Sequence, residues 1–283
     1  MKNKLFYIIL VVVFVAGLSL LLYPTISNAY NTWLQSQAIA EYSQQANQMD
    51  QALYEQEMAK AQAYNAALLE RENPYELSSQ LLGQYEDTLA LTSQGIMAYV
   101  QIPSINVTLP IAHGTSEDVL KDKIGHLEWS SLPVGGKNTH CVISGHRGLP
   151  SAELFTNIDH LQLGDKFYLH VLGQSLEYQV YNISVVEPED QRLLRIEEGQ
   201  DLVTMVTCTP YGINSHRLLV QGVRIGIGDP DQGQDIYVKN EITAIDVVVL
   251  VSVILVAIAV VAFVTVLLRS KKKKGGQQNE KIE

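Results

Sequence analysis

The chain of 283 residues contains only two cysteines, Cys141 and Cys208. Two cysteines are too few for the disulfide framework of a small secreted domain, although a single pairing between them stays open. The sequence also lacks a Cys-x-x-Cys pair, and its seven histidines follow no usual zinc-ligand spacing. A zinc site is therefore the weaker interpretation of these residues, and no metal or other cofactor is expected.

Positive charge is scarce in the middle of the chain. Residues 29–246 hold 12 Lys and Arg against 28 Asp and Glu, which gives this segment a formal charge of −16. Because a nucleic-acid-binding surface needs a basic face, no nucleic acid partner is expected.

Charge is absent altogether from two long apolar runs, Leu5 to Tyr23 and Val247 to Leu268. Runs of about 20 residues are long enough to cross the hydrocarbon core of a lipid bilayer. Cations gather at the outer ends of both runs, namely at Lys2, Lys4, Arg269 and Lys271 to Lys274. The positive-inside rule then predicts two transmembrane helices, with both termini in the cytoplasm and residues 29–246 outside the cell.

The first run also permits another interpretation. The small residues Ser27-Asn28-Ala29 resemble a signal-peptidase cleavage site, so residues 1–28 could be a leader that is removed. The run of 19 apolar residues is longer than a usual signal core and favours an anchor. In either case the second run would attach the domain to the bilayer.

Residues 29–70 lack glycine and proline and are rich in Ala, Gln and Glu. Apolar side chains recur there at alternating spacings of three and four residues, at Ile39, Tyr42, Ala46, Met49 and Leu53. This periodicity predicts a helical stalk that leads away from the membrane. The helix is expected to stop near Asn73-Pro74, because proline disfavours a helical residue before it.

Short apolar runs alternate with turn signals between residues 95 and 228. Many short strands with few long helical patterns predict a mostly-β sandwich or barrel. Short helical turns are expected at Ser116 to Lys121 and at Ala152 to Phe155. The predicted strands are Met97 to Ile102, Val107 to Ile111, His140 to Ser144, Lys166 to Leu172, Leu176 to Val186, Leu202 to Cys208 and Arg217 to Ile227.

The predicted domain plan has six parts. The first half consists of a cytoplasmic stub with the first span (1–28), a stalk with a lid segment (29–94) and the β domain (95–228). A linker (229–246), the second span (247–268) and a basic cytoplasmic tail (269–283) follow.

One predicted hairpin brings a cysteine and an arginine together. Cys208 ends one strand and Arg217 opens the next, so antiparallel pairing would make them neighbours at one rim of the sheet. A guanidinium favours the thiolate, and it donates hydrogen bonds to an oxygen that gains negative charge beside the sulfur. A strand-end cysteine is also commonly a small buried hydrophobe, so the spacing alone leaves both interpretations open.

His146 is the histidine with the most suitable setting for proton transfer. It follows a predicted strand within Ser144-Gly145-His146-Arg147-Gly148, where the glycines leave the imidazole ring unshielded. The other histidines lack this setting, and strand alternation points His216 away from the face of Arg217. Acyl transfer needs such a group as acid and base.

Four segments of the chain resemble the class C sortases, the pilus-assembling kind. The resemblance covers about residues 95–228 and includes a Thr-x-x-Thr-Cys run followed nine residues later by an arginine. The layout with two spans is also similar. The segments that carry it are IPSINVTLPIAHGTSEDVL, GHLEWSSLPVGGKNTH, NTHCVISGHRGLPSAELF and VTMVTCTPYGINSHRLLVQGVR.

The resemblance implies a closed sortase-type β-barrel with Cys208 as nucleophile, His146 as general acid and base, and Arg217 as oxyanion stabiliser. It implies cleavage of a sorting signal of Leu-Pro-x-Thr-Gly (LPxTG) type between Thr and Gly, through a thioacyl intermediate and without a cofactor. In the pilus class, a lysine of the next pilin subunit then forms an isopeptide bond. The implied location is the plasma membrane of a Gram-positive bacterium, with the catalytic domain outside.

Two further residues take their interpretation from the resemblance. Thr207 belongs to the same motif, and either shapes the pocket through its hydroxyl or is an ordinary β-branched strand residue. Cys141 is expected to be a small core residue, because a disulfide with Cys208 would consume the nucleophile.

Class C sortases also resemble one another in a flexible N-terminal cover over the active site that carries Asp-Pro-aromatic. The matching place here reads Asn73-Pro74-Tyr75. It predicts a lid whose Tyr75 lies over Cys208. Its latch would be weak, because a neutral amide replaces the acid that would pair with an active-site arginine. The alternative is an ordinary helix stop followed by a surface tyrosine.

Two other functions stay open. One is a sortase that attaches surface proteins to a peptidoglycan precursor. The other is a non-catalytic extracellular β domain that binds a ligand. Such a binding domain has no reason to keep Cys208, His146 and Arg217 in these settings.

Overall fold

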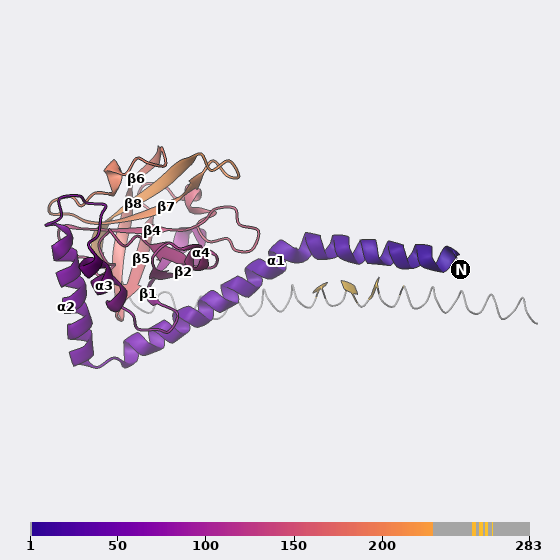
Figure 1. Cartoon of the computed structure of the whole chain (residues 1–283), viewed down its shortest axis with the longest axis horizontal. Helices are drawn as coiled ribbons and strands as arrows, with labels where there is room; N and C mark the ends of the chain where they lie inside the picture. Colours follow the sequence, from indigo (N-terminus) through magenta and orange to yellow (C-terminus); the bar gives the residue numbers. More distant parts are fainter. Residues whose placement is uncertain (1, 229–250, 253–254, 257, 260–261, 263–283) are drawn as a thin grey trace, which may run out of the picture.

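The computed structural model describes residues 2–228 together with residues 251–252, 255–256, 258–259 and 262 (Figure 1). The predicted linker and tail lie outside the described residues, and so does most of the predicted second span. In the described part of the chain, one helix, α1 (Lys2–Gln48), is long and apolar enough to cross a membrane.

Eight strands of the described residues close into a barrel in the order β1-β2-β3-β4-β7-β8-β6-β5. The prediction of a mostly-β closed barrel is therefore confirmed. The strands are β1 Ile96–Ile102, β2 Val107–His113, β3 Ile124–His126, β4 Thr139–Ser144, β5 Lys166–Val171, β6 Gln174–Val186, β7 Asp201–Thr209 and β8 His216–Ile227. Short helices connect them: η1 Pro103–Ile105, α4 Glu117–Leu120, η2 Ile158–His160 and η3 Arg192–Leu194.

The elements differ from the prediction in two places within the barrel. The sequence pattern missed β3, because three residues are too few for a readable alternation. The helical turn predicted at Ser116 to Lys121 is present as α4, but Ala152 to Phe155 do not form a helix. Leu154 has a positive φ of 41°, which a right-handed helix cannot contain.

Close packing fills the barrel interior. Aromatic and aliphatic side chains such as Phe167, Tyr178 and Met205 are almost fully buried there. Gly222 on β8 permits this filling, because a Cβ at that position would lie 2.3 Å from the Phe167 ring. Cys141 belongs to the same core.

The predicted single stalk helix is two helices. Asp50 ends α1 and caps α2 (Gln51–Leu68), since its carboxylate accepts a hydrogen bond of 2.8 Å from the Leu53 amide. The chain changes direction at this cap, so α2 runs back beside the barrel and α3 (Ser79–Asp87) follows (Figure 1). The second helix ends at Leu68, five residues ahead of the predicted stop at Asn73-Pro74.

The apolar stripe of α1 packs against the barrel. Ile39, Tyr42 and Ala46 are buried in a cluster with Ile96, Tyr99 and Ala112. The Tyr42 hydroxyl donates a hydrogen bond of 2.8 Å to the Met97 carbonyl. The stripe does not continue past the helix break, where Leu53 is 43% exposed.

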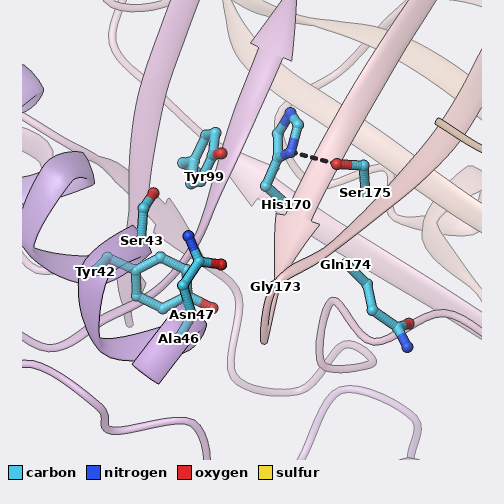
Figure 2. A pocket seen from close by; sticks show the side chains of 9 residues that line it. All are labelled: Tyr42, Ser43, Ala46, Asn47, Tyr99, His170, Gly173, Gln174 and Ser175. Atoms are coloured by element: carbon cyan, nitrogen blue, oxygen red, sulfur yellow. Dashed lines mark hydrogen bonds between the residues drawn. The ribbon is translucent and has the colours of Figure 1, made fainter. Parts of the chain in front are cut away.

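A small cavity of about 30 Å³ lies at this junction of α1 with the barrel (Figure 2). His170 lines it, stacked on Tyr99 with ring centroids 4.2 Å apart. The His170 Nδ1 is 2.7 Å from the Ser175 hydroxyl and its Nε2 is 3.0 Å from the Gln101 side-chain oxygen. Burial lowers the pKa of His170 from 6.5 to about 4, so the ring is neutral at pH 7.

This neutral histidine predicts a loss of stability in mild acid. Between pH 6.5 and pH 4, His170 binds a proton in the unfolded chain but not in the folded chain. The free energy of unfolding therefore decreases as the pH is lowered through this range. We expect a His170→Gln variant to lose about 2 kcal/mol less than the wild type between pH 7 and pH 4.5. Urea unfolding at the two pH values measures this, and equal losses in both proteins would contradict it.

Candidate active site

Strands β7 and β8 place Cys208 and Arg217 together. They pair antiparallel, with Cys208 directly opposite Arg217 and Thr209 opposite His216. Directly opposite residues project from the same face of a sheet, with Cβ atoms about 5 Å apart. The backbone register therefore pairs Cys208 with Arg217 at one rim of the barrel.

Strand β4 brings His146 to the same rim. It runs parallel to β7, with Ser144 opposite Val206. Beyond the strand, the Gly145 amide donates to the Val206 carbonyl at 3.1 Å, and the Thr207 hydroxyl donates to the Gly145 carbonyl at 2.7 Å. His146, two residues past the end of β4, therefore follows the strand beside the end of β7 that carries Cys208.

Gly145 has a steric requirement in this arrangement. A Cβ there would lie 2.4 Å from the Ile124 side chain and 2.9 Å from the Phe155 ring. A residue with a side chain would displace the loop that carries His146. Thr207 acts on the same loop, because its buried hydroxyl reaches the Gly145 carbonyl.

Arg147 connects the loop after β4 with the loop after β7. It forms an ion pair with Asp159, donates to the Thr209 hydroxyl at 3.3 Å, and lies 5.8 Å from the Tyr211 ring centroid. In the sequence, Arg147 was notable only as a neighbour of His146. Nothing in the spacing indicated that Asp159 would be its partner.

Within the described part of the chain, the Arg217 guanidinium forms no ion pair with a carboxylate. Its Nη1 donates to the backbone carbonyls of His216 at 3.1 Å and Asn214 at 3.4 Å. His216 itself lies 3.3 Å from Glu187. Arg217 thus keeps donors and a positive charge that an oxyanion beside Cys208 can use.

The two cysteines have different environments. Both are free, so the single disulfide that the sequence left open is not formed. Cys208 is half-buried at the rim, whereas Cys141 is 3% exposed within the core. Burial raises the pKa of the Cys141 thiol far above its usual value, which keeps it protonated and unreactive.

Other buried histidines serve the fold. His126 bonds the Ser131 carbonyl at 2.9 Å, and burial lowers its pKa to about 3. Burial also lowers the pKa of His140, whose two ring nitrogens each lie 2.7 Å from a partner, the Arg195 carbonyl and the Thr204 hydroxyl. Among the described residues, no three His, Cys, Asp or Glu side chains converge as metal ligands.

The segment Asn73-Pro74-Tyr75 lies against the barrel. The Asn73 side chain accepts a hydrogen bond of 3.1 Å from the Tyr75 amide. The Tyr75 hydroxyl donates to the Gln191 carbonyl at 2.9 Å and accepts from Arg195 Nε at 3.1 Å. Its ring meets Trp129 edge-on, with centroids 5.1 Å apart.

Trp129 relates this segment to Cys208. It packs on a cluster of Val142, Leu194, Val206 and Leu219. Val206 and Cys208 are two residues apart on β7, so they share one face of the strand. Tyr75 therefore packs, through Trp129, on the barrel face that bears Cys208, and the arginine that contacts it is Arg195.

The comparisons with known proteins agree with this geometry. A family model for the sortase domain matches residues 100–225. Three similar solved structures each cover 68% of this chain. Sortase C1 of Streptococcus agalactiae is 45% identical with a TM-score of 0.66, and all of that chain is covered. Sortase C of Streptococcus pneumoniae is 46% identical, and sortase C of Clostridium perfringens with a C-terminal cell wall sorting motif is 41% identical; both have a TM-score of 0.60 and are covered over 99% of their length.

The chain belongs to the sortase family of cysteine transpeptidases. Its likeness to the three sortase C structures extends over almost their whole length, which supports class C. The segments that match curated sortases are shorter, spanning 39% to 63% of those relatives. This sortase therefore shares the whole structured domain of class C enzymes and only part of each curated relative.

Proposed function

We propose that this sortase cleaves an LPxTG-like sorting signal between Thr and Gly and joins pilin subunits by isopeptide bonds. Cys208, His146 and Arg217 are its catalytic residues. The register that sets Cys208 opposite Arg217, with His146 two residues past the end of the parallel neighbouring strand β4, is the observation that carries this proposal. The similar sortase C of Streptococcus pneumoniae, whose structure gives insight into pilin substrate specificity, supports the choice of substrate.

The geometry supports a two-step acyl transfer. The Cys208 thiolate attacks the threonine carbonyl, and Arg217 stabilises the oxyanion that forms. His146 protonates the departing glycine amine as the carbon–nitrogen bond breaks, which leaves a thioacyl enzyme. A pilin lysine amine then attacks this thioester, His146 removes its proton, and the thiolate of Cys208 is released.

The environment of the domain agrees with such substrates. We place the barrel on the outer face of a Gram-positive plasma membrane, held by α1 and by the second span predicted at 247–268. Substrates that are themselves membrane-bound would then meet the enzyme on one surface.

Covalent ladders would test the function. The full chain in nanodiscs is mixed with a pilin that carries a sorting signal and an acceptor lysine, and the products are separated on a denaturing gel. We expect a ladder of polymers, with an isopeptide bond identified by mass spectrometry. A single adduct with an added peptidoglycan precursor and no ladder would favour the cell-wall-attaching sortase. Binding of pilin without any covalent product would favour the binding domain.

The lid interpretation of Asn73-Pro74-Tyr75 leads to a prediction about access to Cys208. Tyr75→Ala removes the ring packing on Trp129 and the bonds to Gln191 and Arg195. These contacts are worth about 1.4 kcal/mol, so the open fraction and the rate of Cys208 modification by a thiol reagent should rise about tenfold.

The control for this experiment is Tyr181→Ala, at an exposed tyrosine on β6. It should leave the modification rate unchanged. The same rate in Tyr75→Ala and in the wild type would favour the surface tyrosine over the lid.

A further inference from the structure

The loop between β4 and η2 is docked on α1. The side-chain oxygen of Asn28 accepts a hydrogen bond of 2.9 Å from the Glu153 amide. The side-chain nitrogen of Asn31 donates one of 2.8 Å to the Ser151 carbonyl. One residue lies between the two loop partners, so two points of a short segment are held by adjacent turns of one helix.

The same loop carries His146. The Phe155 amide donates to the His146 carbonyl at 3.1 Å, and the Gly148 amide donates to the Thr156 hydroxyl at 3.1 Å. Between these closures, Ala152 and Leu154 are buried. These hydrogen bonds tie the two ends of the loop together, so a displacement at the docking points near Glu153 would also displace His146.

The docking points lie just past the apolar run of α1. Asn28 follows Tyr23 by five residues and Asn31 by eight, which is about 8 and 12 Å along a helix. The headgroup layer on each side of a bilayer is about 5–8 Å thick, and helix tilt lowers these heights further. The loop thus meets α1 at the outer edge of the lipid headgroups.

Exposed aromatic side chains lie at the same height along α1 as the two docking asparagines. Tyr23, Tyr30 and Trp33 are 55%, 56% and 43% exposed on α1, and the rings of Tyr30 and Trp33 lie 6.1 Å apart. Tyrosine and tryptophan are enriched at membrane–water interfaces. The interval from Tyr23 to Trp33 contains both docking asparagines.

We propose that α1 holds the loop of His146 against the bilayer surface, with Asn28 and Asn31 as positioning residues of the active site. The partner of this face is the headgroup layer of the lipid bilayer. This inference rests on the proposed function for the roles of His146 and Cys208. The anchor helix is then part of the catalytic scaffold, and the rim of the barrel that bears His146 opens close to the membrane.

The same substitution, asparagine to aspartate, is expected to have opposite effects on the hydrogen bonds at Asn28 and Asn31. Asn28 acts as an acceptor, so Asn28→Asp keeps its bond, whereas Asn31 acts as a donor, so Asn31→Asp loses its bond. Each change adds the same negative charge. In nanodiscs with a sorting-signal peptide, we expect Asn31→Asp and Asn28→Ala to lower kcat about tenfold, with KM within twofold. Asn28→Asp should stay within twofold of the wild type for both constants.

Two further readouts separate positioning from a general structural defect. Amide hydrogen exchange should increase over residues 147–156 in Asn31→Asp and Asn28→Ala only, at an unchanged melting temperature. Gln44→Glu, an amide-to-acid change at an exposed α1 position, should match the wild type. Equal effects of Asn28→Asp and Asn31→Asp, or no effect of Asn31→Asp, would overturn the positioning role.

Fluorescence quenching tests the position at the bilayer. In a Trp33→Phe, Trp129→Phe background, a tryptophan is placed at exposed Glu153 or at exposed Gln48, the end of α1 about 37 Å past Tyr23. Lipids with a spin label on the headgroup should quench the first at least threefold more than the second. Equally weak quenching at both positions would overturn membrane apposition. Turnover by the wild-type chain in the same nanodiscs reports separately on the proposed function.

Discussion

Cys208→Ala is expected to lower transpeptidation by about 10⁴-fold or more, while the chain stays folded. The alanine cannot form the thioacyl intermediate, and neither His146 nor Arg217 offers another nucleophile. The measurement is the initial rate of amine-dependent cleavage of a sorting-signal peptide, together with the melting temperature. Cys208 is at the rim and outside the core cluster, so the free energy of unfolding should change by less than about 1 kcal/mol.

The second cysteine provides the matched control. Cys141→Ala removes the same atoms from the core on β4, where burial keeps the thiol protonated. We expect its rate to remain within about threefold of the wild type and its stability to fall by about 1 kcal/mol. A thiol reagent should modify the folded wild type at Cys208 alone. Full activity of Cys208→Ala would exclude the proposed mechanism.

Arg217→Ala is expected to lower kcat by about 10²- to 10³-fold with a smaller change in KM. The guanidinium lies opposite Cys208 and pairs with no carboxylate of the described residues, so its donors are available to the developing oxyanion. Losing one such donor costs about 3–4 kcal/mol of transition-state stabilisation. Steady-state kinetics with the sorting-signal peptide would measure the loss.

Two further variants test whether charge or geometry matters at Arg217. Arg217→Lys keeps the charge but lacks the planar fork of donors, so we expect it to recover only part of the lost rate. Lys137→Ala removes an exposed cation ahead of β4, close to the start of β7 and far along that strand from Cys208. It should leave kcat unchanged. Equal losses in Arg217→Ala and Lys137→Ala would indicate a general effect of charge.

The hairpin of Cys208 and Arg217 could be predicted because it is local. The strands flank a short turn-rich loop, so antiparallel pairing makes the last residue of one strand the neighbour of the first residue of the next. The short apolar runs and their turn signals predicted a mostly-β sandwich or barrel, and the family resemblance favoured the closed barrel. The stalk was predicted only in part, because the apolar spacing in the sequence runs on from Met49 to Leu53 and conceals the helix break at the Asp50 cap.

His146 and its surroundings required the tertiary structure. His146 comes beside Cys208 through the parallel pairing of β4 with β7, whose residues are more than 60 positions apart. No sequence spacing encodes that pairing, and only the family resemblance pointed to it. The ion pair of Arg147 with Asp159 likewise depends on how η2 packs.

The amino-acid sequence by itself predicted the long apolar helix, the many short strands and the pairing of Cys208 with Arg217. These depend on composition and on contacts between near neighbours along the chain. Only the tertiary structure decided that the loop of His146 docks on Asn28 and Asn31, and that Tyr75 meets Arg195. The physical reason is that such contacts join segments about 120 residues apart, which meet only when α1 and the segment after α2 pack on the folded barrel.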